Sequence, residues 1–185
     1  MGSKRIGLAR TQALIENLKR ELSGLRYQTK YVTGTGSQDF SGLTGNTTVL
    51  VNAAIGSGNY IRLPEATAAN AGMHIQVIFA VAPAAVCKVG VVNGFLVGGA
   101  SAHSDATATG HCDTNTAIAV SAVGTENHRI ELDVDAAAKA GGAAGTILDF
   151  WYTGAANVII YRGNLIGNVD TATLATHFVA TAVNA

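Results

Sequence analysis

The first thirty residues carry apolar positions at the spacing of a helix. This spacing predicts an amphipathic helix over residues 9–25, with Thr11 as its N-cap and Gly24 at its end. A helix of about four turns is marginal alone, so its apolar stripe should dock on the rest of the chain, on copies of itself or on another protein. The stripe consists of Leu14, Ile15, Leu18, Leu22 and Leu25.

After about residue 28 the hydrophobic period changes to two, and clusters of Gly, Asn, Thr and Ser separate the apolar runs. Short turns between such runs predict a mainly β fold, namely an antiparallel β-sandwich or jelly roll of about nine strands. The chain therefore divides into a basic, amphipathic helical arm, residues 1–28, and a β-sandwich domain, residues 29–185. The expected strands are 27–33, 47–53, 59–64, 73–82, 87–97, 116–123, 128–134, 146–153 and 157–166.

Three segments allow finer predictions. Residues 73–82 are apolar at nearly every position, which is typical of a central or covered strand. Residues 153–157 should form a hairpin loop, and the polar stretch 98–115 should be a long exposed loop, functional or interfacial.

In residues 128–134, charged and apolar side chains alternate. Alternation of this kind predicts one solvated strand face, formed by Arg129, Glu131 and Asp133.

Charge is scarce and unevenly distributed. Only 13% of the 185 residues are charged, against about 25% in ordinary soluble domains, which suits surfaces that pack against neighbours. Residues 1–30 hold seven basic and two acidic residues, so 7 − 2 = +5, and the rest of the neutral chain carries −5. A basic segment of this kind usually has its own partner. Its basic residues are Lys4, Arg5, Arg10, Lys19, Arg20, Arg26 and Lys30.

Catalytic signatures are scarce. The glycine-rich stretches 34–42 and 56–60 lack the strand-to-helix context of a phosphate loop, and no GxSxG nucleophile elbow is present. Glu131, Asp133 and Asp135 could supply paired carboxylates, but such positions are more often a solvated edge. The aromatic pair at 151–152 is interpreted as core or interface rather than as a sugar platform. The chain is therefore expected not to be an enzyme.

Candidate metal ligands gather in one stretch, but their spacing matches no metal motif, and no metal or other cofactor is predicted. A trimer axis that brings three copies of one histidine together is the route by which a metal could still bind. Cys87 and Cys112 are interpreted as two small buried or half-buried residues, with a disulfide or a metal site as the alternatives. The candidate ligands are His103, Asp105, His111, Cys112 and Asp113.

No window of the sequence has the length and hydropathy of a membrane span, and no secretory signal is evident at its start. A membrane partner is therefore not expected. The basic arm could contact phosphate groups, but residues 1–26 contain no aromatic residue for stacking on bases. This favours a protein partner over DNA or RNA.

Several stretches together resemble virion structural proteins of tailed phages, particularly marine and cyanobacterial ones. They are KRIGLARTQALIENLKREL, SGNYIRLPEATAANAGMHIQVIF, FLVGGAS and GTILDFWYTGAANVIIYRGNLIG, followed by a tail rich in Thr and Ala. Among virion proteins, the size and β-sandwich pattern are similar to capsid decoration, or cement, proteins, which commonly sit as trimers outside the head. The resemblance carries no catalytic residues.

The resemblance implies a bacteriophage structural protein that stabilises the capsid through inter-subunit contacts. It would sit on the capsid exterior of the virion after assembly in the host cytoplasm, bound to the major capsid protein and to itself as a homotrimer. The alternatives are a tail fibre or appendage subunit that binds a host surface glycan, and a glycan-cleaving enzyme. The residues expected to bind the capsid or another copy are Lys4, Arg5, Arg10, Leu14, Leu18, Lys19, Arg20, Leu22 and Arg26.

Overall fold

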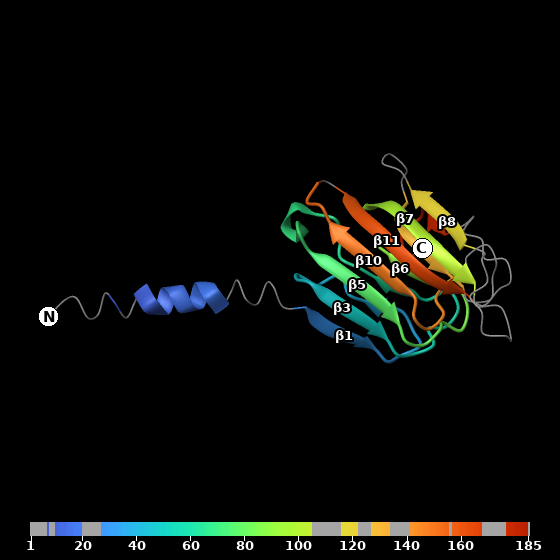
Figure 1. Cartoon of the computed structure of the whole chain (residues 1–185), viewed down its shortest axis with the longest axis horizontal. Helices are drawn as coiled ribbons and strands as arrows, with labels where there is room; N and C mark the ends of the chain where they lie inside the picture. Colours follow the sequence, from blue (N-terminus) through green and yellow to red (C-terminus); the bar gives the residue numbers. More distant parts are fainter. Residues whose placement is uncertain are drawn as a thin grey trace.

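A computed structural model describes residue 7 and residues 10–19, 27–104, 116–121, 127–133, 141–155, 157–167 and 177–184. Residues 10–19 form the expected helix, which stands apart from the β-domain (Figure 1). Gly7 is also helical, and the Thr11 hydroxyl donates a hydrogen bond of 2.8 Å to the Gly7 carbonyl oxygen. Thr11 therefore lies inside the helix, and its prediction as the N-cap is wrong.

The described residues of the β-domain form twelve strands in two sheets, with one short 3₁₀ helix, η1 (Ala68–Asn70). The seven-stranded sheet has the order β1-β3-β5-β10-β11-β7-β8, and the five-stranded sheet has the order β12-β9-β6-β4-β2. The strands are β1 (Gln28–Val32), β2 (Gln38–Asp39), β3 (Thr47–Val51), β4 (Tyr60–Arg62), β5 (His74–Phe79), β6 (Cys87–Gly90), β7 (Phe95–Ser104), β8 (Thr116–Ser121), β9 (Arg129–Leu132), β10 (Ile147–Tyr152), β11 (Val158–Gly167) and β12 (Phe178–Val179).

The first six strands wind between the sheets. β1, β3 and β5 are parallel neighbours in one sheet, and β2, β4 and β6 are parallel neighbours in the other. From β1 to β6 the chain alternates between the two sheets, adding one strand to each sheet in turn. Each strand added to a sheet therefore runs in the same direction as the previous strand of that sheet. The fold is thus mainly β, as predicted, but its sheets are mixed, which corrects the antiparallel sandwich or jelly roll. A period of two shows which side chains share a face, and it carries no information about strand direction.

The second half of the chain adds antiparallel pairs. β10 and β11 form a hairpin beside β5, so the loop predicted at residues 153–157 is confirmed. Gly154 and Asn157 adopt positive φ angles of 75° and 65° in this turn. β5 lies between β3 and β10, which confirms its prediction as a central strand.

Twelve strands replace the expected nine because short elements and one break were missed. β2 and β12 have two residues each, too few for a visible alternation. Gly94, with a φ of 142°, separates β6 from β7 inside the single strand predicted at residues 87–97. β7 then continues to Ser104, so residues 98–104 are strand and not loop, and residues 105–115 lie outside the described part of the chain.

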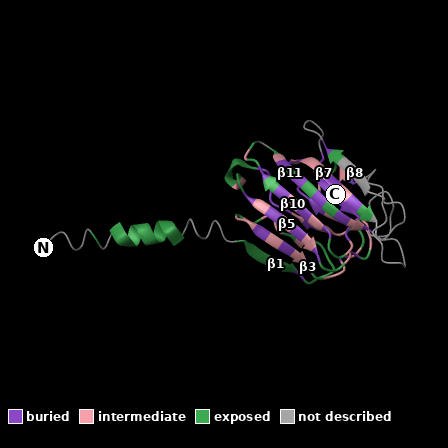
Figure 2. Cartoon of the chain, in the orientation of Figure 1, coloured by how far each residue is buried: buried purple, intermediate pink, exposed green. Residues whose placement is uncertain are grey.

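The hydrophobic core lies between the two sheets, and buried positions alternate with half-buried or exposed ones along β5, β10 and β11 (Figure 2). Tyr161 is the largest fully buried side chain. Gly163 makes room for this side chain, because a Cβ there would overlap the Tyr161 hydroxyl, and Gly98 makes room for the Tyr161 backbone carbonyl. Inward side chains that fill this core include Val49, Val51, Ile75, Val77, Phe79, Leu96, Leu148, Phe150 and Ile159.

The solvated face predicted for β9 is not present in the structure. All four of its residues are buried, including Arg129 and Glu131, while Asp133, just beyond the strand, is half-buried. The C-terminal segment accounts for this burial, because the Ala182 carbonyl accepts a 2.7 Å hydrogen bond from Arg129 and Val183 is fully buried. The alternation of residues 128–134 was therefore interpreted wrongly, since a distant segment covers the charged side.

Candidate functional site

The seven-stranded sheet turns one face toward the core and the other face away from it. Strand registers place its side chains in rows that cross the sheet. We use the name outer face for Thr29, Tyr31, Thr48, Leu50, His74, Gln76, Ile78, Val97, Gly99, Val120, Ile147, Asp149, Trp151, Ile160, Arg162 and Asn164.

Large apolar side chains are exposed on this face. Val120 is 74% exposed, Tyr31 59%, Ile160 40% and Trp151 36%. Because Trp, Tyr and Arg are the residues most often found at the energetic centre of protein interfaces, this composition is typical of a contact surface.

An aromatic cluster crosses one row of the outer face. The His74 ring stacks on Trp151 with a centroid distance of 4.8 Å and an interplanar angle of 3°. Tyr27 meets the same histidine edge-on, with its hydroxyl 2.6 Å from His74 Nδ1. Three rings from three segments are thus held in a fixed arrangement at the surface.

Asp149, in the neighbouring row of the outer face, holds His74 of this cluster in place through a hydrogen bond. Its Oδ1 atom lies 2.9 Å from His74 Nε2 and accepts a 2.9 Å hydrogen bond from Gln76 Nε2. Arg162 lies opposite Asp149 on β11 and is exposed, but no ion pair joins the two among the described residues. Hydrogen bonds thus connect Tyr27 to His74 and His74 to Asp149. Because both ring nitrogens of His74 have a hydrogen-bond partner, the orientation of the His74 ring is fixed.

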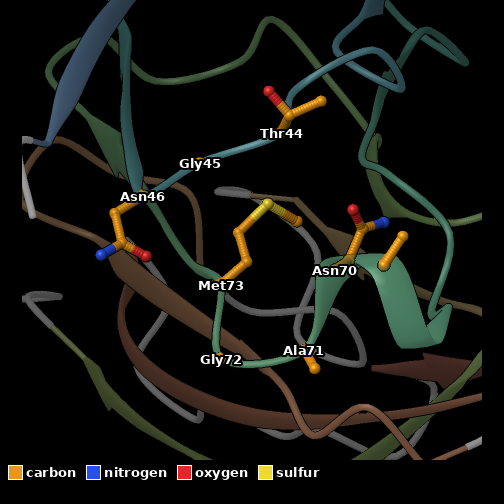
Figure 3. Close-up of a pocket in the computed structure, with 8 residues that line it drawn as sticks. Thr44, Gly45, Asn46, Asn70, Ala71, Gly72 and Met73 are labelled. Atoms are coloured by element: carbon orange, nitrogen blue, oxygen red, sulfur yellow. The ribbon is translucent and has the colours of Figure 1, made fainter. Parts of the chain in front are cut away.

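A small depression adjoins the cluster. It has a volume of about 170 Å³ and is lined by two short segments, residues 44–46 and 69–73 (Figure 3). Asn46 connects the two features, because its Oδ1 atom accepts a 2.8 Å hydrogen bond from the His74 backbone N–H. The lining contains no charged residue, so the depression suits a neutral polar group.

The five-stranded sheet has a different surface. Arg62 lies 3.5 Å from Asp39 and 3.6 Å from Glu65, and Arg129 pairs with Glu131 at 2.7 Å. Charged side chains on this sheet are therefore used within the chain, whereas the outer face of the other sheet presents apolar and aromatic groups outward.

The structure describes four of the residues predicted to bind a partner. Arg10, Leu14, Leu18 and Lys19 lie on the helix and are exposed, Leu14 by 62%. The helix stripe is thus not covered by its own β-domain. The other five lie outside the described residues: Lys4, Arg5, Arg20, Leu22 and Arg26.

Sequence reasoning missed the outer face as a site. The sequence did contain a signal for this face, because residues 146–153 and 157–166 carry apolar or aromatic residues at both the inward and the outward positions of each strand. A strand with only one face in the core would place polar residues at positions 151 and 160.

The predicted ligand stretch is mostly undescribed. His103 is exposed on β7, while Asp105, His111, Cys112 and Asp113 lie outside the described residues. Within the described ranges, no three His, Cys, Asp or Glu side chains are grouped as metal ligands would be. Cys87 is a buried free thiol, and burial raises its pKa to about 12. The described helix is too short to cross a bilayer.

Comparisons with protein-family models, with curated proteins and with solved structures found no match to this chain.

Proposed function

We propose that this chain is a non-enzymatic structural protein of a phage virion, a decoration protein that stabilises the capsid through contacts between subunits. It would bind the major capsid protein and further copies of itself, as a homotrimer on the capsid exterior. The observation that carries the proposal is the outer face, a wide and nearly uncharged sheet surface with exposed Tyr31, Trp151 and Ile160. The sequence resemblance to tailed-phage virion proteins supplies the setting.

A decoration protein acts by burying surface between its neighbours. Stable protein interfaces bury about 800 Å² on each partner, and apolar burial contributes about 25 cal/mol per Å² before the costs of association. Small uncharged residues pack with little desolvation penalty, so a low charge content supports such a role. The arm adds a second contact element, since the described basic and apolar residues of its helix, residues 10–19, are exposed.

The location of the chain in the virion tests this proposal. A cryo-EM reconstruction of the virion should show the β-domain in many copies, arranged with the symmetry of the head lattice. Density for the chain confined to the tail, in a few copies, would overturn the decoration role.

A tail appendage that binds a glycan is the second candidate, and one feature of the site favours it. The Trp151 ring lies near a neutral depression lined by the amides of Asn46 and Asn70, and saccharides are bound by aromatic rings together with amide groups. Binding of host surface polysaccharide by the wild-type chain, lost on Trp151→Ala, would support this candidate. Equal retention of both proteins on the polysaccharide would remove it.

A further inference from the structure

Two apolar surfaces of this chain lack a partner within the described residues. One is the helix stripe, where Leu14, Ile15 and Leu18 are all about half exposed or more. The other is the outer face, where Trp151 and Ile160 are exposed on the neighbouring strands β10 and β11. Amphipathic helices commonly pack their apolar stripe on the apolar face of a sheet, so the helix stripe and the outer face are suitable packing partners.

The arm joins the β-domain at the rim of the outer face. Tyr27, which precedes β1, contacts His74 of that face through its hydroxyl and its ring edge. The helix nevertheless stands away from the domain (Figure 1), and its stripe remains exposed. The exposed helix of one copy can therefore pack on the same face of a neighbouring copy.

Size and charge are compatible with this contact. Ten helical residues span about 15 Å, and seven strands give a face about 29 Å wide, so the helix fits within it. Residues 1–28 carry six basic and two acidic residues, so 6 − 2 = +4, and the remaining residues carry −4, so the arm of one copy is attracted to the β-domain of another. Arg10 and Lys19 stand at the two ends of the described helix, where they can reach beyond the apolar contact.

We infer that the helix at residues 10–19 of one copy packs its Leu14 and Leu18 side chains on the outer face of the next copy, over Trp151 and Ile160. This contact joins two different surfaces, so it repeats from copy to copy, and it closes into a ring when the rotation between copies brings the last copy back to the first. The inference takes only the number of copies, three, from the proposed function. Its test uses purified protein without capsids. The contact between copies can therefore be absent while the protein still binds capsids, or be present while it does not.

Paired variants of the full chain test the contact. The arm variant is Leu14→Lys with Leu18→Lys, and the face variant is Ile160→Lys. Val81→Lys is the matched control, because Val81 is 38% exposed, nearly the same as Ile160 at 40%, but lies outside the outer face. Sedimentation velocity gives the mass of each protein, and circular dichroism with thermal melting checks that each is folded. Ile160→Ser replaces Ile160→Lys if the lysine lowers the melting temperature.

Wild type and the Val81→Lys control should sediment as a closed oligomer of three copies, and the arm and face variants should each sediment as monomers. Mixing the two variants is decisive. The arm variant keeps a working face and the face variant keeps a working arm, so the mixture should form a 1:1 heterodimer. A wild type that is monomeric at all concentrations tested contradicts the inference. So does an oligomer that survives either variant, which would indicate contacts between two arms or between two faces.

Discussion

Arg129 and Glu131 form a buried ion pair on β9, with Arg129 Nη2 2.7 Å from Glu131 Oε1. Arg129 Nε also donates to the same oxygen at 3.1 Å, and Nη1 donates to the Ala182 carbonyl at 2.7 Å. One guanidinium thus connects the five-stranded sheet to the C-terminal segment that covers it. Removal of either partner should be costly because the other charge is left buried.

The first prediction concerns this pair. Arg129→Met or Glu131→Leu alone should lower the free energy of unfolding by about 3 to 5 kcal/mol, whereas the double variant Arg129→Met, Glu131→Leu should recover most of that loss. Urea unfolding of the three proteins measures the difference. A double variant that loses the sum of both single effects would show that the two residues act independently.

The second prediction concerns pH and His177, which is fully buried with its Nε2 atom 3.0 Å from the Tyr161 hydroxyl. Burial lowers the pKa of His177 to about 4, and the backbone hydrogen bond between His177 and Glu131 opposes this shift only in part. Because the folded pKa lies below the unfolded value of about 6.5, protonation favours the unfolded chain. This stabilising contribution is complete above pH 6.5 and should fall by about 3 kcal/mol as the pH drops to 4.

Unfolding free energies measured between pH 7 and pH 4 test this expectation. His177→Gln cannot titrate in this range, so its stability should change less with pH than that of the wild type. An identical pH dependence in both proteins would assign the acid sensitivity to other groups.

The third prediction concerns Gly98, which has a φ of 141° and packs against the Tyr161 backbone. Gly98→Ala should lower the free energy of unfolding by at least about 2 kcal/mol, because the added methyl overlaps the Tyr161 carbonyl oxygen and the backbone is strained for an L residue. Gly36→Ala is the control, since a Cβ at Gly36 meets no atom within 4 Å. Its stability should stay within about 0.5 kcal/mol of the wild type, and equal effects at both glycines would refute the steric account.

The fourth prediction concerns Cys87, whose buried thiol has a pKa of about 12. At pH 8 only about one molecule in ten thousand would carry the reactive thiolate. In a Cys112→Ser background, iodoacetamide should leave Cys87 unmodified in the folded protein and alkylate it fully in urea, as read by intact mass. Rapid modification without urea would place the thiol at the surface.

The predictable part of the fold was the set of well-patterned strands. β3, β5, β10 and β11 lie where the period-two runs placed them, because each buries alternate side chains in one core. Strand direction was not predictable, since parallel and antiparallel neighbours share the same alternation. β7 was missed in part because Gly98 and Gly99 lack side chains, although this backbone pairs with β11 over ten residues.

The arm was the only part of the candidate site that was predicted from the sequence. The leucine stripe on residues 10–19 was visible as a helical period, and its exposure follows from the absence of covering residues in the described structure. The outer face depends on register, which brings His74, Asp149 and Trp151 together from strands about seventy-five residues apart. The burial of Arg129 likewise depends on the distant Ala182. Such tertiary neighbours leave no local pattern in the chain.

The most direct test of the decoration role is a thermal DNA-release assay on three kinds of particle: native heads, heads that lack this protein, and bare heads to which the purified protein has been added back. Heads without the protein should release DNA at a lower temperature than native heads. Added protein should restore most of the difference, even at raised salt, because apolar burial is not screened whereas ion pairs from the basic arm are. Equal release temperatures for all three particles would contradict the claim that the protein stabilises the capsid.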